Sequence, residues 1–308
     1  MDNLNRRTFL KTCSTAAAAI QMGLLSGWTE ELPKMCIAKY SSSPKEADGI
    51  AEEADRLTRK AIEAIGGISR FISKGDVVWI KPNIGWDRRP EQAANTNPHV
   101  VATIIKLCYE VGAKKVVISD NPCNDQRRTF ANSQIQQEAE KAGAHVFFLD
   151  PRKYKKMAMN GKVLKEWEIY TDVVESNKVI NVPIAKHHQL TTVTLSMKNL
   201  MGVIGGARDR YHQDSTNTLP DLAAFIKPQL TVLDAIRILT GNGPVGGNLK
   251  DVQRKDLIVA GTDYVAIDAF GATLLGHKPE DIGHIKEANA RGLGKMDYAS
   301  LSPKEITV

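Results

Sequence analysis

Short apolar runs that end abruptly in polar residues constrain the fold of this chain more than any other feature. Val77 to Ile80 is a near-continuous apolar run that stops at Lys81-Pro82-Asn83. Val116 to Ser119 repeats the pattern and stops at Asp120-Asn121-Pro122. Runs without apolar and polar alternation suit strands that are buried on both faces of a parallel sheet. The two runs therefore predict the interior of an α/β fold.

Segments with helical signals separate the apolar runs. Glu46 to Ile65 has apolar residues at intervals of three and four, and Asn97 to Glu110 begins with an N-cap asparagine followed by proline. Further helices are expected at Asn132 to Ala142 and Tyr264 to Leu275. Further strands are expected at Met35 to Tyr40, His145 to Leu149, Val179 to Pro183, Gln229 to Leu233 and Leu257 to Ala260. This alternation predicts a mixed or mostly parallel open sheet flanked by helices, with two lobes as an option.

Length and composition allow one large or two modest domains. The chain has 308 residues, of which 42% are hydrophobic and 25% are charged. A single α/β domain is predicted over residues 35–300, and the polar segment 151–176 is either a sub-boundary or an excursion. The formal net charge is +6, but positive and negative residues are interspersed without a block of like charge. We therefore expect no nucleic-acid partner.

Residues 1–30 have the pattern of a twin-arginine export signal. Arg6-Arg7 precedes the moderately apolar stretch Thr12 to Leu25. A stretch of about 14 residues is too short to span a bilayer, which takes about 20, but it suits the apolar region of a signal. The pattern predicts export through the twin-arginine (Tat) translocase to the periplasm. Whether the signal is cleaved or anchors the protein to the membrane stays open.

The cysteine count argues against a cysteine-held cluster. Of the four cysteines, Cys13 falls in the signal, which leaves Cys36, Cys108 and Cys123. This odd number, without a C-x-x-C pair, predicts buried free thiols and neither a disulfide framework nor an iron–sulfur cluster held by this chain alone. Export by this route is common for proteins that carry a cofactor, but the sequence does not identify one.

Polar side chains follow four of the predicted strands. They are Lys81 with Asn83, Asp120 with Asn121, Lys186 with His188, and Asp234. Ammonium and amide groups at convergent strand ends can bind a carboxylate or phosphate, and a nearby imidazole can transfer a proton near neutral pH. Ligand sites of open α/β sheets lie at these ends. Each lysine taken alone is equally consistent with a solvated loop charge.

The stretch LSMKNLMGVIGGARDRYH, from Leu195 to His212, combines an apolar helical face with cationic side chains. Lys198 and Asn199 lie in the predicted helix, and glycines follow that let the backbone approach a ligand closely. Arg208 and Arg210 add guanidinium groups suited to carboxylate or phosphate. The interpretation is an anion-binding segment; the alternative is a glycine-rich turn with solvent-facing arginines. The loop Gly241 to Gly247 is either a lid over the site or a plain turn.

A metal site is the alternative use of the histidines and aspartates. Adjacent His187 and His188 on an extended chain point to opposite faces, so at most one of them aims at a given site. His212, Asp120 and Asp234 are the available further ligands, without a spacing typical of a zinc or iron site.

The order and spacing of several short motifs resemble the domain of unknown function 362. The motifs are Ile80-Lys81-Pro82-Asn83, Thr96-Asn97-Pro98, Gly112-Ala113-Lys114-Lys115, Lys186-x-His188, Ser196-Met197-Lys198-Asn199-Leu200-Met201-Gly202, Asp234 followed by Gly243-Pro244, and Asp263-Tyr264-Val265-Ala266-Ile267-Asp268. The resemblance covers roughly Met35 to Gly294 and implies no particular activity. Some relatives carry a ferredoxin-like module with iron–sulfur clusters, which implies a separate ferredoxin-like partner for a chain without such cysteines.

The sequence therefore predicts an exported protein that binds a small anionic ligand or cofactor in a strand-end pocket, with a redox or proton-transfer reaction as an option. The predicted proton-transfer residues are His188 and His212. The predicted ligand-binding residues are Lys81, Asn83, Lys186, Lys198, Asn199 and Arg208, and the candidate metal ligands are Asp120 and Asp234. The alternative is a non-catalytic accessory, maturation or redox-partner protein associated with iron–sulfur proteins.

Overall fold

The computed structural model describes residues 32–41 and 47–308, so the predicted export signal at residues 1–30 lies outside the described residues. Residues 32–308 form one compact unit. Among the described residues, ten strands form one sheet and two form a separate hairpin. The strands are β1 (Met35–Lys39), β2 (Val77–Pro82), β3 (Lys115–Ile118), β4 (His145–Val146), β5 (Tyr154–Ala158), β6 (Glu166–Tyr170), β7 (Lys178–Val182), β8 (Ile184–His188), β9 (Thr192–Thr194), β10 (Leu230–Leu239), β11 (Val252–Gly261) and β12 (Lys304–Thr307).

Helices connect and cover these strands. They are α1 (Ala47–Ala64), α2 (Pro98–Glu110), α3 (Gln126–Asn132), α4 (Ile135–Lys141), α5 (Thr171–Glu175), α6 (Ser196–Asn199), α7 (Ser215–Ile226), α8 (Tyr264–Leu274) and α9 (Gly283–Ala290). The predicted start of α2 is confirmed, because the Asn97 side chain accepts a hydrogen bond from the amide of His99 and Pro98 is the first helical residue.

The sheet is mixed and mostly parallel, as the sequence predicts. Its strand order is β12-β1-β11-β10-β7-β2-β3-β4. Neighbours from β10 to β4 run parallel, whereas β11 is antiparallel to both β1 and β10. Beyond the end of β7, the chain turns at Pro183 and continues as β8, which also pairs with β10. Because β8 continues along β10, its residues lie beyond the edge of the sheet at which β2 and β3 end.

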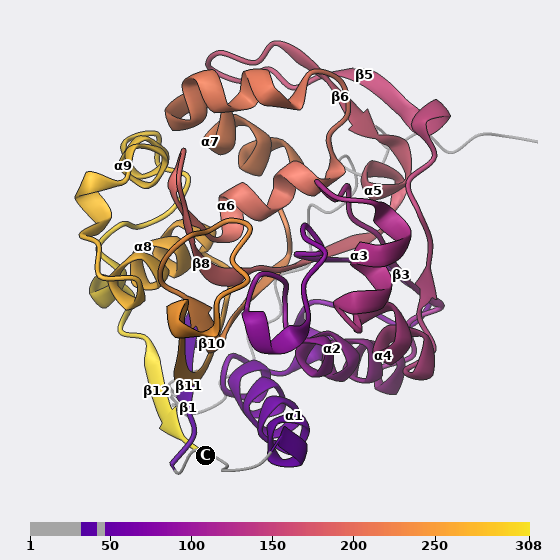
Figure 1. The fold of residues 1–308 in the computed structure, drawn as a ribbon, viewed down its shortest axis with the longest axis vertical. Coiled ribbons are helices and arrows are strands. Elements are labelled where there is room, and N and C mark those ends of the chain that lie inside the picture. The colour runs from indigo at the N-terminus through magenta and orange to yellow at the C-terminus, as the bar shows by residue number, and fades with distance from the viewer. Residues whose placement is uncertain (1–31, 42–46) are drawn as a thin grey trace, which may run out of the picture. The chain divides into compact units, whose positions relative to one another are not determined.

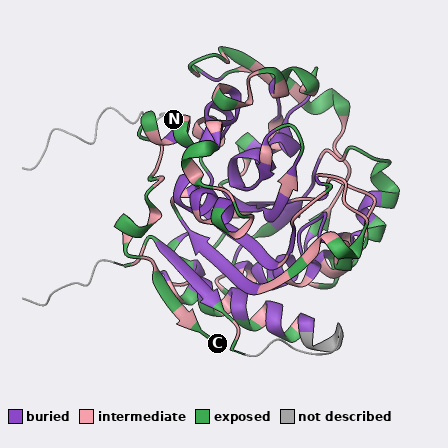
Figure 2. Ribbon diagram, turned by 60° about the vertical axis from the view of Figure 1, so that its left-hand side comes forward, coloured by how far each residue is buried: buried purple, intermediate pink, exposed green. Residues whose placement is uncertain are grey.

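Each face of the sheet is covered by its own layer of helices (Figure 1). Successive side chains of a strand point to opposite faces. In β2, Val78 and Ile80 pack with α1, α2 and α4, whereas Trp79 belongs to the core on the side of α6 to α9. Figure 2 shows the central strands buried between these layers. Burial on both faces is why the strand runs are almost continuously apolar.

The structure confirms one expectation about local structure and selects between the two alternatives of another. The helix expected at Asn132 to Ala142 is present as α4; it is preceded by α3, which ends at Asn132, and by Gln134 in a left-handed conformation with φ of 59°. The segment 151–176 is an excursion within the compact unit: it forms the β5–β6 hairpin and α5. Asp221 of α7 holds the hairpin turn by accepting hydrogen bonds from the amides of residues 162–164 at 2.8 to 2.9 Å.

Candidate functional site

The carboxyl ends of β2, β3 and β8 meet around a cavity of about 270 Å³. Parallel strands end at the same edge of a sheet, so the residues that follow them come together there. Eight of the residues predicted to form a site line this cavity: Asn83, Asp120, Lys186, His188, Lys198, Asn199, Arg208 and His212. Lys81 and Asp234 do not line it.

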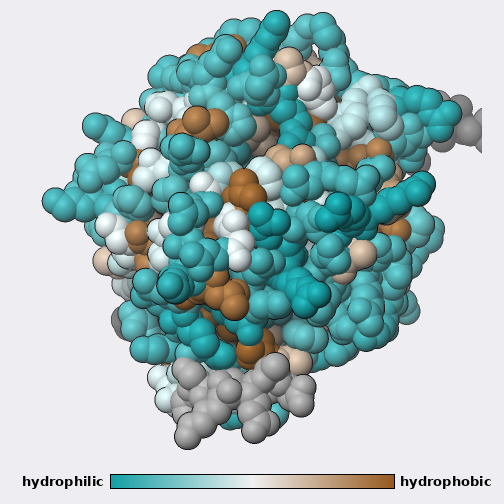
Figure 3. Space-filling view, in the orientation of Figure 1, coloured by the Kyte–Doolittle hydropathy of each residue, from teal (hydrophilic) through white to brown (hydrophobic). Residues whose placement is uncertain are grey.

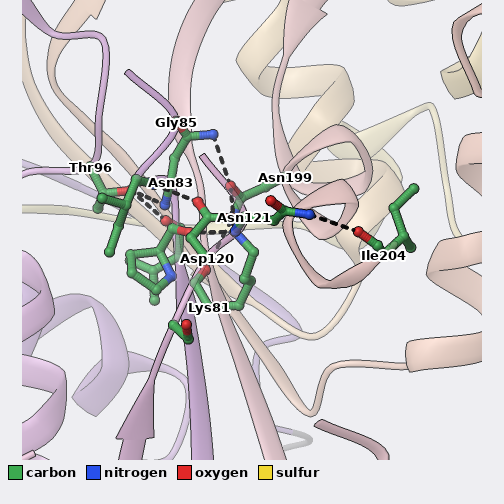
Figure 4. Close-up of polar contacts among 12 residues, drawn as sticks. Lys81, Asn83, Gly85, Thr96, Asp120, Asn121, Asn199 and Ile204 are labelled. Carbon is green, nitrogen blue, oxygen red and sulfur yellow. Dashed lines mark hydrogen bonds and ion pairs between the residues drawn. The ribbon is translucent and has the colours of Figure 1, made fainter. Parts of the chain in front are cut away.

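Lys81 lies beneath the cavity, paired with Asp120 (Figure 4). Its buried ammonium is 3.0 Å from a carboxylate oxygen of Asp120 and donates to the carbonyl of Pro82 at 2.5 Å. Burial lowers the pKa of Lys81, and the Asp120 carboxylate opposes that shift. Lys81 therefore compensates the charge of Asp120, which corrects the prediction that Lys81 contacts the ligand.

Gly202 allows the segment that follows α6 to pass directly over this ion pair. A Cβ atom at Gly202 would overlap a carboxylate oxygen of Asp120 and the end of the Lys81 side chain. Only a hydrogen atom fits at this position. The glycine therefore provides a close backbone approach to the ion pair, and Gly202 also lines the cavity.

Asn199 connects the strand ends through its side-chain amide. Its Nδ2 donates to the carbonyl of Lys81 at 2.9 Å and to Oδ1 of Asn181 at 2.8 Å, and its Oδ1 accepts from Nδ2 of Asn83 at 3.0 Å. Both amide hydrogens of Asn199 are thus used within the protein. Asn199 therefore orders the cavity wall that it lines, and its contact with a ligand stays a prediction.

A buried carboxylate of α8 fixes the position of α6. Asp268 accepts hydrogen bonds from the amides of Ser196 at 2.6 Å and Met197 at 3.1 Å. Burial raises the pKa of Asp268 to about 7. The helix is shorter than expected from the sequence, because β9 extends to Thr194 and a 3-10 turn follows from Leu200.

Lys186 projects from β8 into a ring of oxygen atoms. Its ammonium donates to Oδ1 of Asn83 at 3.1 Å and to the carbonyls of Ala94 at 2.6 Å and Pro244 at 3.4 Å. Burial lowers the pKa of Lys186 to about 7. The side chain therefore exchanges its proton close to neutral pH.

Lys198 differs from the other two lysines because the protein gives its ammonium no partner. The residue is only 9% exposed and lines the cavity, and within the described part of the chain its ammonium makes no hydrogen bond or ion pair. Burial lowers the pKa of Lys198 to about 8. Below that pH, Lys198 presents an uncompensated positive charge to the cavity.

Arg208 places a second cation at the cavity wall. Its Nη1 donates to the carbonyl of Asn121 at 2.7 Å, and its Nη2 lies 3.5 Å from Sγ of Cys123. A guanidinium has five N–H groups, so donors remain for a ligand. Arg210, which comes from the same segment, is exposed and lies outside the lining.

His188 and His212 form a stacked pair in the wall, with ring centroids 5.7 Å apart and an angle of 22° between the rings. Nδ1 of His188 accepts a hydrogen bond from the amide of Leu190 at 3.1 Å, so Nε2 carries the hydrogen of the neutral ring. Burial and the charge of Lys198 lower the pKa of His188 far below its usual value and that of His212 to about 4. Both rings are therefore neutral at pH 7.

The adjacent His187 points away from the cavity, as expected for neighbours in a strand. Its Nδ1 accepts a hydrogen bond from the amide of Gly243 at 3.1 Å, and the amide of Gln189 donates to the carbonyl of Gly243 at 3.3 Å. The loop from 241 to 247 is thereby held against the end of β8. Its Pro244 forms part of the cavity wall.

The two candidate metal ligands have structural partners. Asp234 is buried and accepts hydrogen bonds from the amides of Asn97 at 2.7 Å and Ile236 at 3.1 Å, away from the cavity. Asp120 accepts from the amide of Ile84 at 2.6 Å in addition to its ion pair. Over residues 32–41 and 47–308, no group of three or more His, Cys, Asp or Glu side chains could hold a metal ion. The role of these aspartates as metal ligands stays a prediction that their observed contacts do not support.

Comparison with protein families supports the resemblance seen in the motifs. Residues 78–273 match the family described as "Domain of unknown function (DUF362)". The chain belongs to this family. The matched segment contains β2, β3, β8 and α6, and therefore every strand end that forms the cavity of this DUF362 protein.

Two known proteins are similar to this DUF362 chain. The "Thylakoid-associated protein sll1697" of Synechocystis sp. is 27% identical over 263 residues, which cover 81% of this chain and 80% of the relative. Among solved structures, the lactate racemase apoprotein from Thermoanaerobacterium thermosaccharolyticum superposes with a TM-score of 0.43 at 10% identity, over 82% of this chain and 58% of the racemase. The chain thus matches little more than half of the racemase.

Several residues of the DUF362 site were not predicted from the sequence. Asn181 is one, and the signal for it was available, because it is a polar residue inside the apolar strand Val179 to Val182. Unlike Asn181, Trp86 and Leu190 line the cavity. An apolar residue in the turn after β8 was the available signal for Leu190, whereas nothing in the sequence surroundings of Trp86 indicates it. The three cysteines in the described residues are free as predicted; Cys36 and Cys108 are buried, whereas Cys123 is exposed at the cavity.

Proposed function

We propose that this DUF362 protein binds a small carboxylate or phosphate in the strand-end cavity, with Lys198 and Arg208 as its anchors. The observation that supports the proposal is the buried Lys198 ammonium, which has no hydrogen-bond or ion-pair partner among the residues that the structure describes. A buried charge is costly unless an opposite charge or hydrogen-bond acceptors compensate it. An anion in the cavity would supply both.

The charge balance of the lining favours an anion. Asp120 is the acidic residue among the described lining residues, and Lys81 already compensates it. Lys186, Lys198 and Arg208 then leave an excess of positive charge around a space that solvent can enter. Arg208 suits a planar carboxylate or a phosphate, because its free donors can form parallel hydrogen bonds to two oxygens.

We propose proton transfer as the chemical step that this lining would carry out on a bound anion. Lys186, with a pKa of about 7, can give or take a proton at neutral pH, which is the condition for efficient general acid–base catalysis. The neutral ring of His212, whose lowered pKa makes it a weak base, lines the cavity as a hydrogen-bonding group. A non-catalytic accessory protein would instead keep its anion through purification, and native mass spectrometry of the protein taken from cells distinguishes the two.

Replacing Lys198 with methionine tests the binding proposal. Methionine keeps the unbranched shape of the side chain up to the ε position but removes the ammonium group and its charge. We expect Lys198→Met to weaken binding of phosphate and acetate at least tenfold, measured by isothermal titration calorimetry at pH 7 and constant ionic strength. Removal of a hydrogen bond between charged groups typically has an effect of this size.

Lys250→Met is the matched control for this experiment. Lys250 is exposed and lies outside the cavity, so the substitution removes the same charge without changing the lining. Equal anion affinities of wild type, Lys198→Met and Lys250→Met would refute the proposal.

We also propose that the protein is exported and held at or near a membrane. The proposal rests on the twin-arginine pattern at Arg6-Arg7 and is consistent with the name of the thylakoid-associated relative. Among the residues that the structure describes, no helix has the length and apolar character needed to cross a bilayer. Attachment to a membrane would then depend on residues 1–30 or on another protein.

A further inference from the structure

The lining of the cavity changes character from its floor to its mouth. Lys186 is 1% exposed and Lys198 is 9% exposed, so both ammonium groups are buried, whereas the Arg208 side chain is half-buried. Leu190, in contrast, is 68% exposed and lines the same cavity. A ligand that enters charge first would therefore leave its other end beside an apolar side chain.

Leu190 occupies a position where an apolar residue is unusual. It lies in the tight turn between β8 and β9, and such turns favour Gly, Asn, Asp, Ser or Pro. Its amide donates to Nδ1 of His188, which holds the turn at the mouth of the cavity. Residues that depart from the preference of their local structure concentrate at functional sites.

Three further apolar side chains line the cavity with Leu190. Trp86 and Pro244 are half-buried, and Met201 is buried. We call Trp86, Leu190, Met201 and Pro244 the apolar rim. Figure 3 shows that hydrophilic residues cover most of one face of the molecule and that its apolar residues form small, separate groups. Four apolar residues around one cavity therefore provide a local surface suited to an apolar ligand group.

The size of the cavity agrees with a ligand larger than a bare anion. A volume of about 270 Å³ corresponds to roughly nine water molecules at about 30 Å³ each. Acetate has four non-hydrogen atoms and inorganic phosphate has five, so either would leave roughly half of the space empty. The remaining volume is available to a group that contacts the apolar rim.

We propose that the ligand is an amphiphilic anion, in which a carboxylate or phosphate carries an apolar substituent of several carbon atoms. The charged end lies between Lys198 and Arg208, and the substituent extends along the apolar rim toward Leu190. This inference rests on the proposed anion binding and adds the class of ligand. It also assigns Leu190 as a residue that determines specificity.

Affinity as a function of chain length tests the inference. The probes are acetate, butyrate and hexanoate in one series and methyl, butyl and hexyl phosphate in the other, titrated calorimetrically into the full chain at pH 7. A buried methylene contributes about a fourfold gain in affinity. We expect the six-carbon compound to bind at least tenfold more tightly than the shortest one in at least one series.

Leu190→Ser and Leu249→Ser form a matched pair of variants. Leu249 is also an exposed leucine, at 58%, but it lies outside this cavity. We expect Leu190→Ser to reduce the gain from chain length at least threefold and Leu249→Ser to preserve it.

The outcomes separate this inference from the proposed function. If the shortest anions bind in a Lys198-dependent manner but longer chains bind no more tightly, the amphiphilic ligand is refuted and anion binding stands. The inference is also overturned if Leu190→Ser retains the full dependence on chain length. If no compound in either series binds, the proposed function itself fails.

Discussion

Three lysines that follow similar sequence patterns have different roles at the site. Lys81 is paired with Asp120, Lys186 is surrounded by oxygen atoms, and Lys198 has neither type of partner among the described residues. Burial lowers the pKa of each, but only Lys198 combines burial with an unmet need for a counter-charge. The three lysines therefore differ in their chemistry because their surroundings differ, although their side chains are the same.

The lowered lysine pKa values predict a pH dependence of binding. Lys186 and Lys198 lose their protons at about pH 7 and 8, so we expect acetate or hexanoate affinity to fall at least tenfold between pH 6.5 and 9. Calorimetric titration at constant ionic strength measures this. An affinity that is constant over this range would contradict the role of the two ammonium groups.

The free energy of unfolding of the ligand-free protein should rise with pH, whereas its anion affinity should fall. The folded-state pKa of Lys198 lies below its unfolded value of 10.5, so the unfolded chain binds more protons from about pH 8 upward. Between pH 7 and 9, the free energy of unfolding of wild type should therefore rise relative to that of Lys198→Met, as measured by urea denaturation.

At the scale of elements, the site depends on how closely the segment after α6 packs on the ends of β2 and β3. Asp268 of α8 fixes the start of α6, and the absence of a side chain at Gly202 permits the approach to the Lys81–Asp120 pair. The sequence motif from Ser196 to Gly202 thus encodes a packing arrangement as well as part of the cavity lining. Sequence periodicity alone predicted a longer helix than α6. It contains no information about Asp268, the buried carboxylate that binds the first amides of α6.

Gly202→Ala should strongly destabilise the protein. The added methyl group would overlap Asp120 and Lys81, and overpacking next to a buried ion pair costs at least about 2 kcal/mol. Urea denaturation of Gly202→Ala and wild type measures the difference in the free energy of unfolding. Gly241→Ala is the control, because a Cβ there meets only the end of the Asp251 side chain, at 3.3 Å. Equal stabilities of the two variants would contradict the steric argument.

At the scale of the whole molecule, the mixed sheet brings residues from the first and second halves of the chain to one edge. The change of partner at Pro183 determines which residues reach the cavity. Before it, β7 pairs with β2; after it, β8 continues along β10 and places Lys186 and His188 in the cavity wall. The β5–β6 hairpin lies outside this sheet; it is held by Asp221 and by hydrogen bonds of Trp167 and Glu168 to Gly205. The cavity is lined by residues of the main sheet and of the loops and helices that follow its strands.

Replacement of the paired arginines tests the proposed export. We expect Arg6→Lys together with Arg7→Lys to retain the protein in the cytoplasm, because recognition by the translocase depends on the arginine pair. Cell fractionation followed by immunoblotting of the full chain measures the distribution. Lys114→Arg together with Lys115→Arg is a control with the same number of changes outside the signal pattern. Unchanged export of the paired-lysine variant would contradict the proposal.

The sequence by itself determined the α/β class, the positions of the buried strands and the start of α2, because these depend on local signals: apolar runs, an N-cap and a following proline. It also indicated which polar residues gather at strand ends. Only the tertiary structure decided that Lys81 is paired, that Lys198 has no ion-pair partner within residues 32–41 and 47–308, and that Asp234 lies away from the cavity. The physical reason is that charge compensation and burial depend on residues distant in sequence, which only the order of the strands in the sheet brings into contact.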